Sequence, residues 1–440
     1  MILHIGLDDT DSKNGMCTTY IGAIIFYELL KMGAIPIDFP RLIRLNPNWI
    51  WKTRGNAAIA MSFKIEDWLF DKVKKKTIEI VEKMAEKENE DTHPGIVFYK
   101  GEKIPIELKD FSKRVIKYIV TLEEAEEIAK KIGAEIYKIK LGRGIIGALA
   151  AIGEELKEDY TYELIAYRKP ENWGTKRRID KESVIEMDKE TYPYTFDNID
   201  YSTNDIRITP HTPCPVFYGI RSNTMEAAFK AKSILKINEE IERILLFKTN
   251  QATDAHINKV EINDVKPFLS VSLKGEIISN PFIIQGGHVF FWIGNKDNKI
   301  RCAAYEPTKK FRDVILSLRK GDVVEVYGGI KPRENEPLTI NLEKIKVVEI
   351  SQEEKINPIC PKCNKRMKSA GKNKGFVCKK CGFKSINLKP LIIPIKRYIK
   401  PGFYEVPPRA RRHLSKPISR MLFRKEIDLN EIGELRACKK

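Results

Sequence analysis

The sequence predicts a multidomain α+β protein in which a body of alternating strands and helices precedes smaller modules. Strand-like and helix-like runs alternate from residue 2 to about residue 250, which is the pattern of an α/β or α+β body. From about residue 265, short strand-like runs follow one another between turns, with one helix-like stretch near 308–319, and two Cys-x2-Cys pairs come after them. The 440 residues are enough for roughly two to four domains.

Most elements of the body have a local signal of their own. The helix over 19–32 ends at Gly33, and the helix after Thr121 begins with the capping box Thr-Leu-Glu-Glu and ends at Gly133. Residues 72–87 carry apolar side chains on one helical face. Short apolar runs predict strands over 2–7, 57–63, 95–99, 115–120, 136–141, 162–168 and 183–188, and a helix follows the glycine-rich turn that starts at 142.

The β-rich region over 263–350 is predicted to be an OB-fold barrel. Its strands are broken by glycines, a helix follows the third strand, and the run GDVVEVYGGIK has the composition of a barrel strand. The aromatic side chains Phe290, Phe291, Trp292 and Tyr305 could either stack on nucleic-acid bases or fill the barrel interior, and the sequence does not separate the two.

The cysteines Cys360, Cys363, Cys378 and Cys381 are the strongest local signal in the chain. Two Cys-x2-Cys pairs separated by 14 residues put two thiolates on each of two turns, which together complete a tetrahedral S4 shell. We therefore expect a structural zinc site in a ribbon over 351–390, although an iron–sulfur or rubredoxin-type iron centre has the same spacing. The other cysteines are scattered, as expected in a reducing cytosol.

Positive charge is concentrated at the C-terminal end of the chain. The net charge is +18, and residues 351–440 hold 24 Lys and Arg against 7 Asp and Glu. This surplus, in the ribbon and in a basic tail over 391–440, predicts a polyanion partner, and nucleic acid is favoured over a lysine-rich thermophilic surface. No apolar run reaches about 18 residues and no signal-peptide pattern is present, so we expect a cytoplasmic protein with no membrane partner. No protein partner is indicated.

The stretch GLDDTDSKNGMCTTY places Asp8, Asp9 and Asp11 just after the first strand. The carboxyl edge of strands is where α/β proteins usually bind ligands, and clustered carboxylates repel one another unless a cation joins them. A Mg²⁺ site is therefore favoured over ordinary turn and capping chemistry. Thr18 and Thr19 stand where the next helix begins, so each is a candidate N-cap, and a phosphate on either would be stabilised by the helix dipole.

Three further stretches contain candidate binding residues. Residues 39–61 supply basic side chains beside a glycine, which suits a polyphosphate. The turn GRGIIG is a weak match to a glycine-rich nucleotide loop, and 202–224 is a proline-rich loop that is favoured as a pocket lining over a cysteine nucleophile. The predicted nucleotide-binding residues are Arg41, Arg44, Lys52, Arg54, Gly55, Gly142, Arg143 and Gly144, and the loop holds His211 and Cys214.

Taken in order, GLDDTDSKNGMCTTY, FPRLIRLNPN with KTRGNAA, GRGIIGALAAIG and HTPCPVFYGIR, followed by the barrel and the four-cysteine ribbon, resemble the archaeal tRNA(Ile2) 2-agmatinylcytidine synthetase family. The resemblance implies a kinase-like region, placed over 1–195 with an inserted or interleaved part near 65–120. It also implies a ferredoxin-like region over 196–262, in one piece or discontinuous, before the OB-fold and the zinc ribbon. The implied reaction consumes ATP, releases AMP and joins agmatine to position 2 of the wobble cytidine of tRNA(Ile2), so that the anticodon reads AUA.

The resemblance assigns the family's autophosphorylated threonine to Thr18 and its acidic loop to Asp8, Asp9 and Asp11. Phosphorylation of the cytosine carbonyl oxygen would convert a poor leaving group into a good one, which the amine of agmatine can displace. Within this scheme, Mg²⁺ would bind Asp8 and Asp11, and Asp9 would accept a proton.

Other single-residue roles are hypotheses of the same kind. Lys52 and Arg54 would hold the transferring phosphates in line. Asp200, Asp205 and the loop 211–221 are candidates for the agmatine guanidinium on composition alone. Two other functions compete: a non-catalytic nucleic-acid binder built from the OB-fold and ribbon, and a different ATP-dependent small-molecule kinase or ligase.

Overall fold

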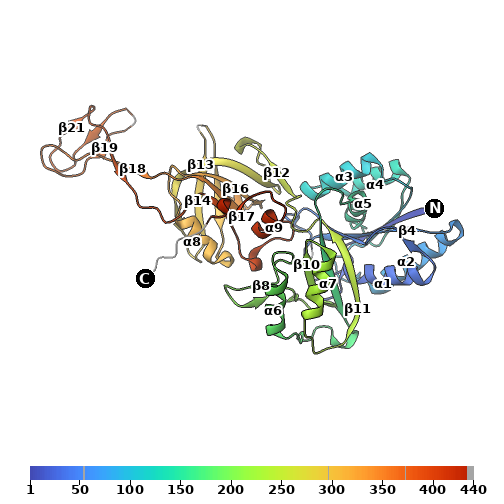
Figure 1. Ribbon diagram of the computed structural model, residues 1–440. Helices are drawn as coiled ribbons and strands as arrows, with labels where there is room; N and C mark the ends of the chain where they lie inside the picture. Colours follow the sequence, from blue (N-terminus) through green and yellow to red (C-terminus); the bar gives the residue numbers. More distant parts are fainter. Residues whose placement is uncertain (53–54, 296, 372, 434–440) are drawn as a thin grey trace.

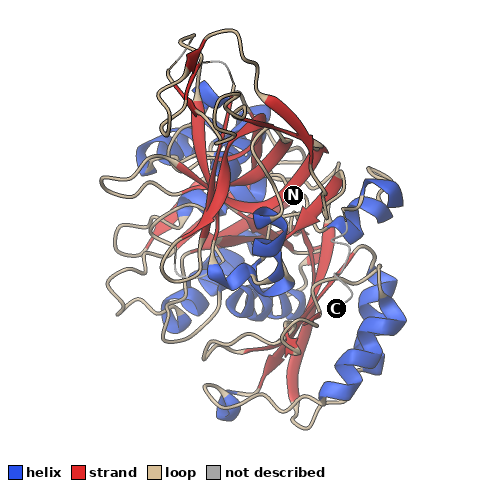
Figure 2. Cartoon of the chain, turned by 90° about the vertical axis from the view of Figure 1, so that its left-hand side faces the viewer, coloured by secondary structure: helices blue, strands red, loops and turns tan. Residues whose placement is uncertain are grey.

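The computed structural model describes residues 1–52, 55–295, 297–371 and 373–433 of the chain. Within them, one large sheet carries helices on both faces, and a second, smaller sheet lies beside it (Figure 1). A narrow two-stranded arm extends from the second sheet and carries the four ribbon cysteines. When the molecule is turned so that the arm faces the viewer, most helices lie outside the strands (Figure 2). No helix of the described residues is long and apolar enough to cross a bilayer.

The large sheet has the strand order β10-β7-β11-β3-β4-β1-β5-β6, with β2 paired to β4. Strand β1 pairs antiparallel with both β4 and β5, whereas β11 pairs parallel with β3. The strands are β1 (Ile2–Asp8), β2 (Ile35–Pro36), β3 (Arg41–Arg44), β4 (Ala57–Lys64), β5 (Gly95–Lys100), β6 (Glu135–Lys138), β7 (Thr161–Arg168), β10 (Val216–Ser222) and β11 (Ile241–Thr249).

Helices α1 and α2 cover one face of this sheet, and α3, α4 and α5 cover the other, followed on that same face by α6 and α7. The helices are α1 (Thr18–Lys31), α2 (Phe70–Met84), α3 (Ile106–Lys117), α4 (Leu122–Ile132), α5 (Ile145–Gly153), α6 (Lys181–Thr191) and α7 (Met225–Ile234). The capping box of α4 and its left-handed end at Gly133 are confirmed.

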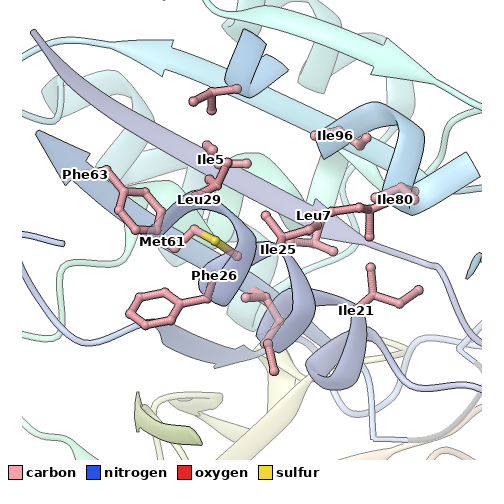
Figure 3. Close-up of a cluster of buried hydrophobic side chains, with 14 of the residues drawn as sticks. Ile5, Leu7, Ile21, Ile25, Phe26, Leu29, Met61, Phe63, Ile80 and Ile96 are labelled. Atoms are coloured by element: carbon pink, nitrogen blue, oxygen red, sulfur yellow. The ribbon is translucent and has the colours of Figure 1, made fainter. Parts of the chain in front are cut away.

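The two faces arise from alternation along the strands. On β4, Met61 and Phe63 join the core formed with α1 and α2, which also contains Ile5 and Leu7 of β1 (Figure 3). The intervening Ala60 faces the opposite core, with α3 and α5. Each face buries a contiguous apolar layer, and this burial is the main favourable contribution to folding.

Glycines let α5 lie directly on the strands. A Cβ on Gly6 of β1 would overlap the carbonyl of Ala148, and a Cβ on Gly95 of β5 would overlap the backbone of Ile145. The start of α5 is therefore held against the end of β1, which is where the acidic turn begins.

Two predicted strands are wrong, because residues 115–117 end a helix with irregular chain after them, and residues 183–188 are helical. Residues 115–120 begin in the last turn of α3, and residues 183–188 lie within α6. The buried side chains of α3 recur at helical spacing, but the run VIKYIV at its end is rich in β-branched residues and hides that period. Helix α6 begins at Asp180, whose carboxylate accepts a hydrogen bond from the backbone nitrogen of Ser183 at 2.8 Å.

Residues 161–191 share a core with residues 205–249. Leu164 of β7, Val184 of α6, Phe217 of β10 and Ala228 of α7 all belong to one buried cluster. The large sheet is continuous across this part of the chain, since β11 pairs with β3 through Lys248 and Arg41. Two short strands, β8 (Ile199–Asp200) and β9 (Asp205–Ile206), pair with each other outside the sheet.

The second sheet forms a closed ring, because β13 pairs with both β14 and β16. Its interior is apolar and includes Phe291, whereas Phe290 and Trp292 alternate onto the outer side, where Phe290 packs against Tyr305. Phe291 therefore fills the barrel interior, and base stacking by Phe290, Trp292 and Tyr305 stays a prediction. The elements are β12 (Ile257–Lys259), β13 (Ser270–Ile283), β14 (Val289–Gly294), β15 (Lys299–Ala304), α8 (Lys310–Leu316), β16 (Val323–Ile330) and β17 (Thr339–Glu349).

The arm consists of β18 and β22, which pair antiparallel, and its tip carries three very short strands around the cysteines (Figure 1). Arg397 anchors the base of the arm, because its guanidinium donates to both carboxylate oxygens of Asp322 at 2.6 and 2.7 Å. The strands are β18 (Glu353–Ile356), β19 (Lys368–Ser369), β20 (Phe376–Val377), β21 (Lys384–Ser385) and β22 (Leu391–Pro394).

Residues 402–433, here called the C-terminal segment, are folded against the rest of the protein and do not form a free basic tail. Strand β23 (Gly402–Glu405) extends the second sheet by pairing with β17, and α9 (Ile418–Phe423) follows it. Leu414 is buried in the core under α3 and α5. The sequence did not predict this arrangement, because the apolar residues that anchor the segment are few and lie between basic residues.

Candidate active site

A cavity of about 580 Å³ opens where β1 and β3 end. It is lined by the acidic turn with the start of α1, the loop after β3, the end of α3, the start of α5, strand β7, strand β10 with the loop before it, and the C-terminal segment. The predicted residues that line it are Asp8, Asp9, Asp11, Thr18, Thr19, Arg44, Lys52, Gly55, Arg143, Gly144, His211 and Cys214.

The acidic turn holds its carboxylates close together in a buried setting. The backbone nitrogen of Asp9 donates to Asp8 Oδ1 at 2.7 Å, and burial together with the Asp9 charge raises the pKa of Asp8 well above its usual value. Burial also raises the pKa of Asp9 to about 6, although Arg143 opposes the shift. A cation or a proton is needed to neutralise this charge.

The three carboxylates have different partners. Asp9 Oδ2 accepts hydrogen bonds from Arg143 Nη2 and from the backbone nitrogen of His93, each at 3.2 Å. Asp8 faces Gly147 of α5, where a Cβ would overlap its Oδ2 atom. The glycines of the GRGIIG motif therefore allow α5 to pack against the acidic turn: Gly142 takes a left-handed backbone conformation, and a Cβ on Gly144 would overlap the carbonyl of Asp8.

Thr18 is the first residue of α1 and lines the cavity. Its hydroxyl accepts a hydrogen bond from the hydroxyl of Thr10 at 3.0 Å. The N-cap position belongs to Cys17, which makes no side-chain capping bond, so the N-cap interpretation of Thr18 and Thr19 is wrong. Thr18 instead stands at the positive end of the helix dipole, beside the carboxylates.

The end of β3 and the loop after it bring positive charge to the cavity. Arg44 donates to Glu163 at 3.3 Å and to Gln251 at 3.2 Å. Lys52 donates to the carbonyl of Pro47, and burial together with nearby cations lowers the pKa of Lys52 to about 8. Arg54 lies outside the described residues.

Arg41 does not line the cavity. It sits three residues before Arg44 on β3, so the two side chains leave opposite faces of the sheet. The buried guanidinium of Arg41 donates to the carbonyl of Glu154 at 2.6 Å. Arg143, in contrast, reaches the cavity and stacks over the ring of Trp51, 5.7 Å from its centroid.

The loop before β10 lines the cavity, as the sequence favoured. His211 and Cys214 do not form a catalytic pair there: the Cys214 sulfur accepts from Arg177 at 3.5 Å, whereas His211 Nε2 lies 3.1 Å from Arg207. Asp200 and Asp205, the candidates for the agmatine guanidinium, pair across β8 and β9 and do not line the cavity.

Sequence reasoning missed several residues of the cavity. Glu163 on β7 lies between two arginines, at 3.3 Å from Arg44 and 3.7 Å from Arg221. His413 of the C-terminal segment completes the wall, although it lies just over 400 positions after the acidic turn. Burial and the surrounding arginines hold the pKa of His413 well below its usual value, so its imidazole is neutral. Only the fold brings it there, and no local sequence signal predicted it.

A Mg²⁺ ion is compatible with this donor set. Mg²⁺ is usually held by one or two carboxylates together with phosphate oxygens and water. Asp11 is buried and Asp8 is half-buried at the cavity wall, and burial together with the charges of Asp9 and Asp11 raises the pKa of Asp8, so a cation there would favour its ionised form. Asp9 is paired with Arg143, so part of its charge is already offset.

The ribbon cysteines converge as predicted. Their four Sγ atoms lie within 4.8 Å of one another, with Cys360 and Cys381 at 3.5 Å and Cys363 and Cys378 at 3.4 Å. A tetrahedral zinc with bonds of about 2.3 Å requires separations close to these. The four thiolates fill the coordination shell, so zinc here has a structural role.

Four family models match consecutive parts of the chain. The TiaS TCKD domain matches residues 4–141, and the TiaS FLD domain matches 142–256. An OB-fold nucleic acid binding domain matches 271–348, the residues of the second sheet, and the TiaS C-terminal zinc ribbon domain matches 357–399. The predicted OB-fold and zinc ribbon are therefore confirmed.

Curated relatives match over nearly the whole length. The tRNA(Ile2) 2-agmatinylcytidine synthetase TiaS of Pyrococcus horikoshii is 49% identical over 95% of this chain and 97% of its own length. That of Archaeoglobus fulgidus is 47% identical over 96% of this chain and 98% of its own. The chain belongs to the TiaS family. The resemblance drawn from the motifs is thereby confirmed.

Solved structures of TiaS proteins have the same fold. A TiaS–tRNA(Ile2)–ATP complex is 44% identical, with a TM-score of 0.83, and covers 99% of this chain and 100% of that one. A TiaS–tRNA(Ile2)–AMPCPP–agmatine complex is 43% identical, with a TM-score of 0.81, and covers 96% of this chain and 98% of that one. TiaS relatives thus have been seen with nucleotide, agmatine and tRNA together.

Proposed function

We propose that this chain is a tRNA-modifying ligase that uses ATP to join agmatine to the wobble cytidine of tRNA(Ile2), forming agmatidine. The observation that carries the proposal is its identity of 46–49% with TiaS enzymes across at least 95% of its length. The cavity at the end of β1 is the place where the reaction would occur, because it joins carboxylates, a threonine hydroxyl and fixed cations.

The cavity residues suit a phosphoryl transfer followed by an amine attack. Arg44, Lys52 and Arg143 would hold the phosphates of ATP, and Mg²⁺ bound at Asp8 and Asp11 would neutralise phosphate charge. A phosphoryl group on cytosine O2 leaves as phosphate when the agmatine amine bonds to C2, and the amine gives up a proton in this step. The cytosine must leave its stack to enter the cavity.

Thr18 is proposed as an accepting group for a phosphoryl group. It is the first residue of α1, at the positive end of the helix dipole, which favours a phosphate there. We assign Asp9 to proton transfer, because its pKa of about 6 permits both protonation states near neutral pH.

The domain assignments follow the same proposal. Residues of the TCKD match would form the kinase-like region, and those of the FLD match would contribute the ferredoxin-like region. The OB-fold and the ribbon would bind the tRNA body, since the described lysines of the ribbon are exposed and lie on an arm that extends away from the large sheet (Figure 1).

Mass spectrometry of the wobble nucleoside tests the function. Full-length protein is incubated with tRNA(Ile2), ATP, Mg²⁺ and agmatine, and Asp8→Asn serves as the matched variant. We expect agmatidine with the wild type and at least a hundredfold less with Asp8→Asn, the order of magnitude lost with a single catalytic group. Unmodified cytidine with active, folded wild-type protein would favour a different ATP-dependent ligase. Tight tRNA binding without any ATP turnover would favour a non-catalytic binder.

A further inference from the structure

Three parts of the protein meet behind the cavity in a buried polar junction. They are the loop after β3, which carries Lys52, the OB-fold, and the C-terminal segment. Buried polar groups destabilise a protein unless they are paired, so a junction with this many paired groups needs an explanation.

Asn48 is the centre of the junction. Its side chain is fully buried, and its amide nitrogen donates to the carbonyl of Leu269 and to Ser270 Oγ, both at 3.0 Å. Its amide oxygen accepts a hydrogen bond from Arg412 Nη1 at 2.5 Å. Asn48 thus ties the loop to the first strand of the OB-fold and to the C-terminal segment.

Arg412 continues the network into the OB-fold. Its Nε atom lies 3.4 Å from Glu343 Oε1 on β17, and Glu343 Oε2 lies 3.0 Å from the buried His256. Gly329 on β16 leaves room for the pair, because a Cβ there would overlap both Arg412 Nη1 and Asn48 Oδ1. The OB-fold is therefore shaped to receive these two side chains.

Lys52 follows Asn48 by four residues, and its Nζ atom donates to the carbonyl of Pro47, the residue before Asn48. Charges that act on Lys52 come from Arg412 of the C-terminal segment and from Lys331 and Glu343 of the OB-fold, and Lys52 itself acts on His413. Arg412 and Lys331 disfavour a proton on Lys52, and Glu343 favours it. Burial would raise the pKa of Glu343, but His256 and Arg412 lower it to about 2, so Glu343 stays ionised.

We propose that Asn48 and Arg412 are positioning residues that hold the Lys52 ammonium at the phosphate-binding wall, and that Lys331 and Glu343 of the OB-fold set its charge. The inference rests on the proposed binding of ATP in the cavity. Its consequence is that the nucleotide site is complete only when the OB-fold and the C-terminal segment are docked on the catalytic body. The module that binds tRNA thereby also controls affinity for the nucleotide.

The test is the pH dependence of AMPCPP affinity in the full-length protein with Mg²⁺. Burial, Arg412 and Lys331 lower the pKa of Lys52 to about 8, so the wild-type affinity should fall as the pH rises through 8. Lys52→Arg keeps its charge at every pH used, and this alkaline fall should disappear. A fall that persists in Lys52→Arg would overturn the inference.

The neighbouring charges should move the alkaline fall in opposite directions. Lys331→Gln and Arg412→Gln remove positive charge and should shift it to higher pH by roughly 0.5 to 1 unit. Glu343→Gln removes negative charge and should shift it to lower pH by a similar amount. A merely structural role would not produce shifts of opposite sign.

Two variants isolate position from charge. Asn48→Ala changes no charge, so the fall should stay near pH 8 while affinity drops on the order of tenfold at every pH. Arg412→Lys keeps the charge but loses the fork that reaches both Asn48 and Glu343, and it should behave like Asn48→Ala.

Thermal melting identifies variants that do not fold. Lys331 is exposed, so Lys331→Gln tests the charge effect even if the buried variants fail. If the wild type binds AMPCPP and its affinity falls at alkaline pH, but Lys331→Gln does not shift that fall, the inference is overturned and the proposed function still stands. Wild-type protein that does not bind AMPCPP overturns both.

Discussion

The arm with its ribbon, residues 351–398, and the C-terminal segment, residues 402–433, are both basic, but their charges have opposite surroundings. The first holds 13 Lys and Arg against 2 Asp and Glu, and its described lysines are exposed. The second holds 7 against 4, and most of its cations lie in buried ion pairs. Arg420, for example, is 1% exposed and donates to both oxygens of Asp159 at 2.5 and 2.9 Å.

The difference separates two uses of positive charge. Exposed lysines on an arm attract a polyanion over a distance and lose this attraction in salt. Buried arginines with two or more partners fix the position of one part of the protein against another. Net charge in the sequence reports the sum of the two and does not distinguish them.

The largest expected effect is the loss of a buried pair. Arg420→Met removes two hydrogen bonds from Asp159, which keeps Lys416 as a partner, and leaves the carbonyls of Ala252 and Tyr160 without this donor, so it should reduce the free energy of unfolding by about 3 kcal/mol. Denaturant unfolding of the full chain measures it. Arg409→Met, an exposed arginine of the same segment, should change it by less than about 0.5 kcal/mol. Equal losses of unfolding free energy in Arg420→Met and Arg409→Met would contradict the distinction between buried and exposed cations.

The pH dependence of this pair has a defined sign. Burial alone would raise the pKa of Asp159, but hydrogen bonds from Arg420 and Lys416 hold it below its usual value. The folded pKa lies below the unfolded one, so the stabilisation is fully present above the unfolded pKa and is lost as the pH falls through the folded pKa. The stability difference between wild type and Arg420→Met should therefore shrink below about pH 4. A difference that grows in acid would contradict the ion pair as its cause.

A smaller effect is expected from the ribbon. Cys378→Ser removes one of four thiolates and should unfold the ribbon locally, lowering tRNA affinity by roughly tenfold or more while ATP binding is retained. A chelator should reproduce the loss in the wild type, and added zinc should reverse it. Equal loss of tRNA and ATP binding would show that the ribbon is not a separate module.

The smallest effect comes from single exposed charges. Lys379→Gln combined with Lys380→Gln should lower the slope of log K for tRNA against log salt by about 1 to 2. Lys425→Gln, an exposed lysine of the C-terminal segment, should change the slope less. Filter binding over a salt series measures both slopes. A larger change with Lys425→Gln than with the ribbon variant would contradict the assignment of tRNA-binding charge to the ribbon.

The sequence predicted which residues of the acidic turn lie together better than it predicted the other walls of the cavity. Asp8, Asp9, Asp11 and Thr18 are close in sequence, so a short turn was enough to bring them together. The glycines after β6 were predicted as a phosphate cradle, but they also serve close packing, because Gly147 has Asp8 where a Cβ would be.

What the sequence could not predict depends on long-range contacts. His413 reaches the cavity only because β23 pairs with β17 and Leu414 inserts under α3. Arg41 was misplaced because strand alternation, and not charge, decides which face a side chain takes. The two mistaken strands were short β-branched runs, whose period is ambiguous over a single helical turn.

The central claim is that the acidic turn and Thr18 form the phosphoryl-transfer site of the cavity. Phosphopeptide mapping of the full-length protein after incubation with ATP and Mg²⁺ tests it most directly. The method identifies the phosphorylated residue, whichever phosphoryl group of ATP is transferred. The account predicts phosphate on Thr18, none in Thr18→Ala, and retained phosphate on Thr18 in Thr19→Ala, with all three proteins folded. Phosphate that persists in Thr18→Ala, or full agmatidine formation by that variant, would contradict it.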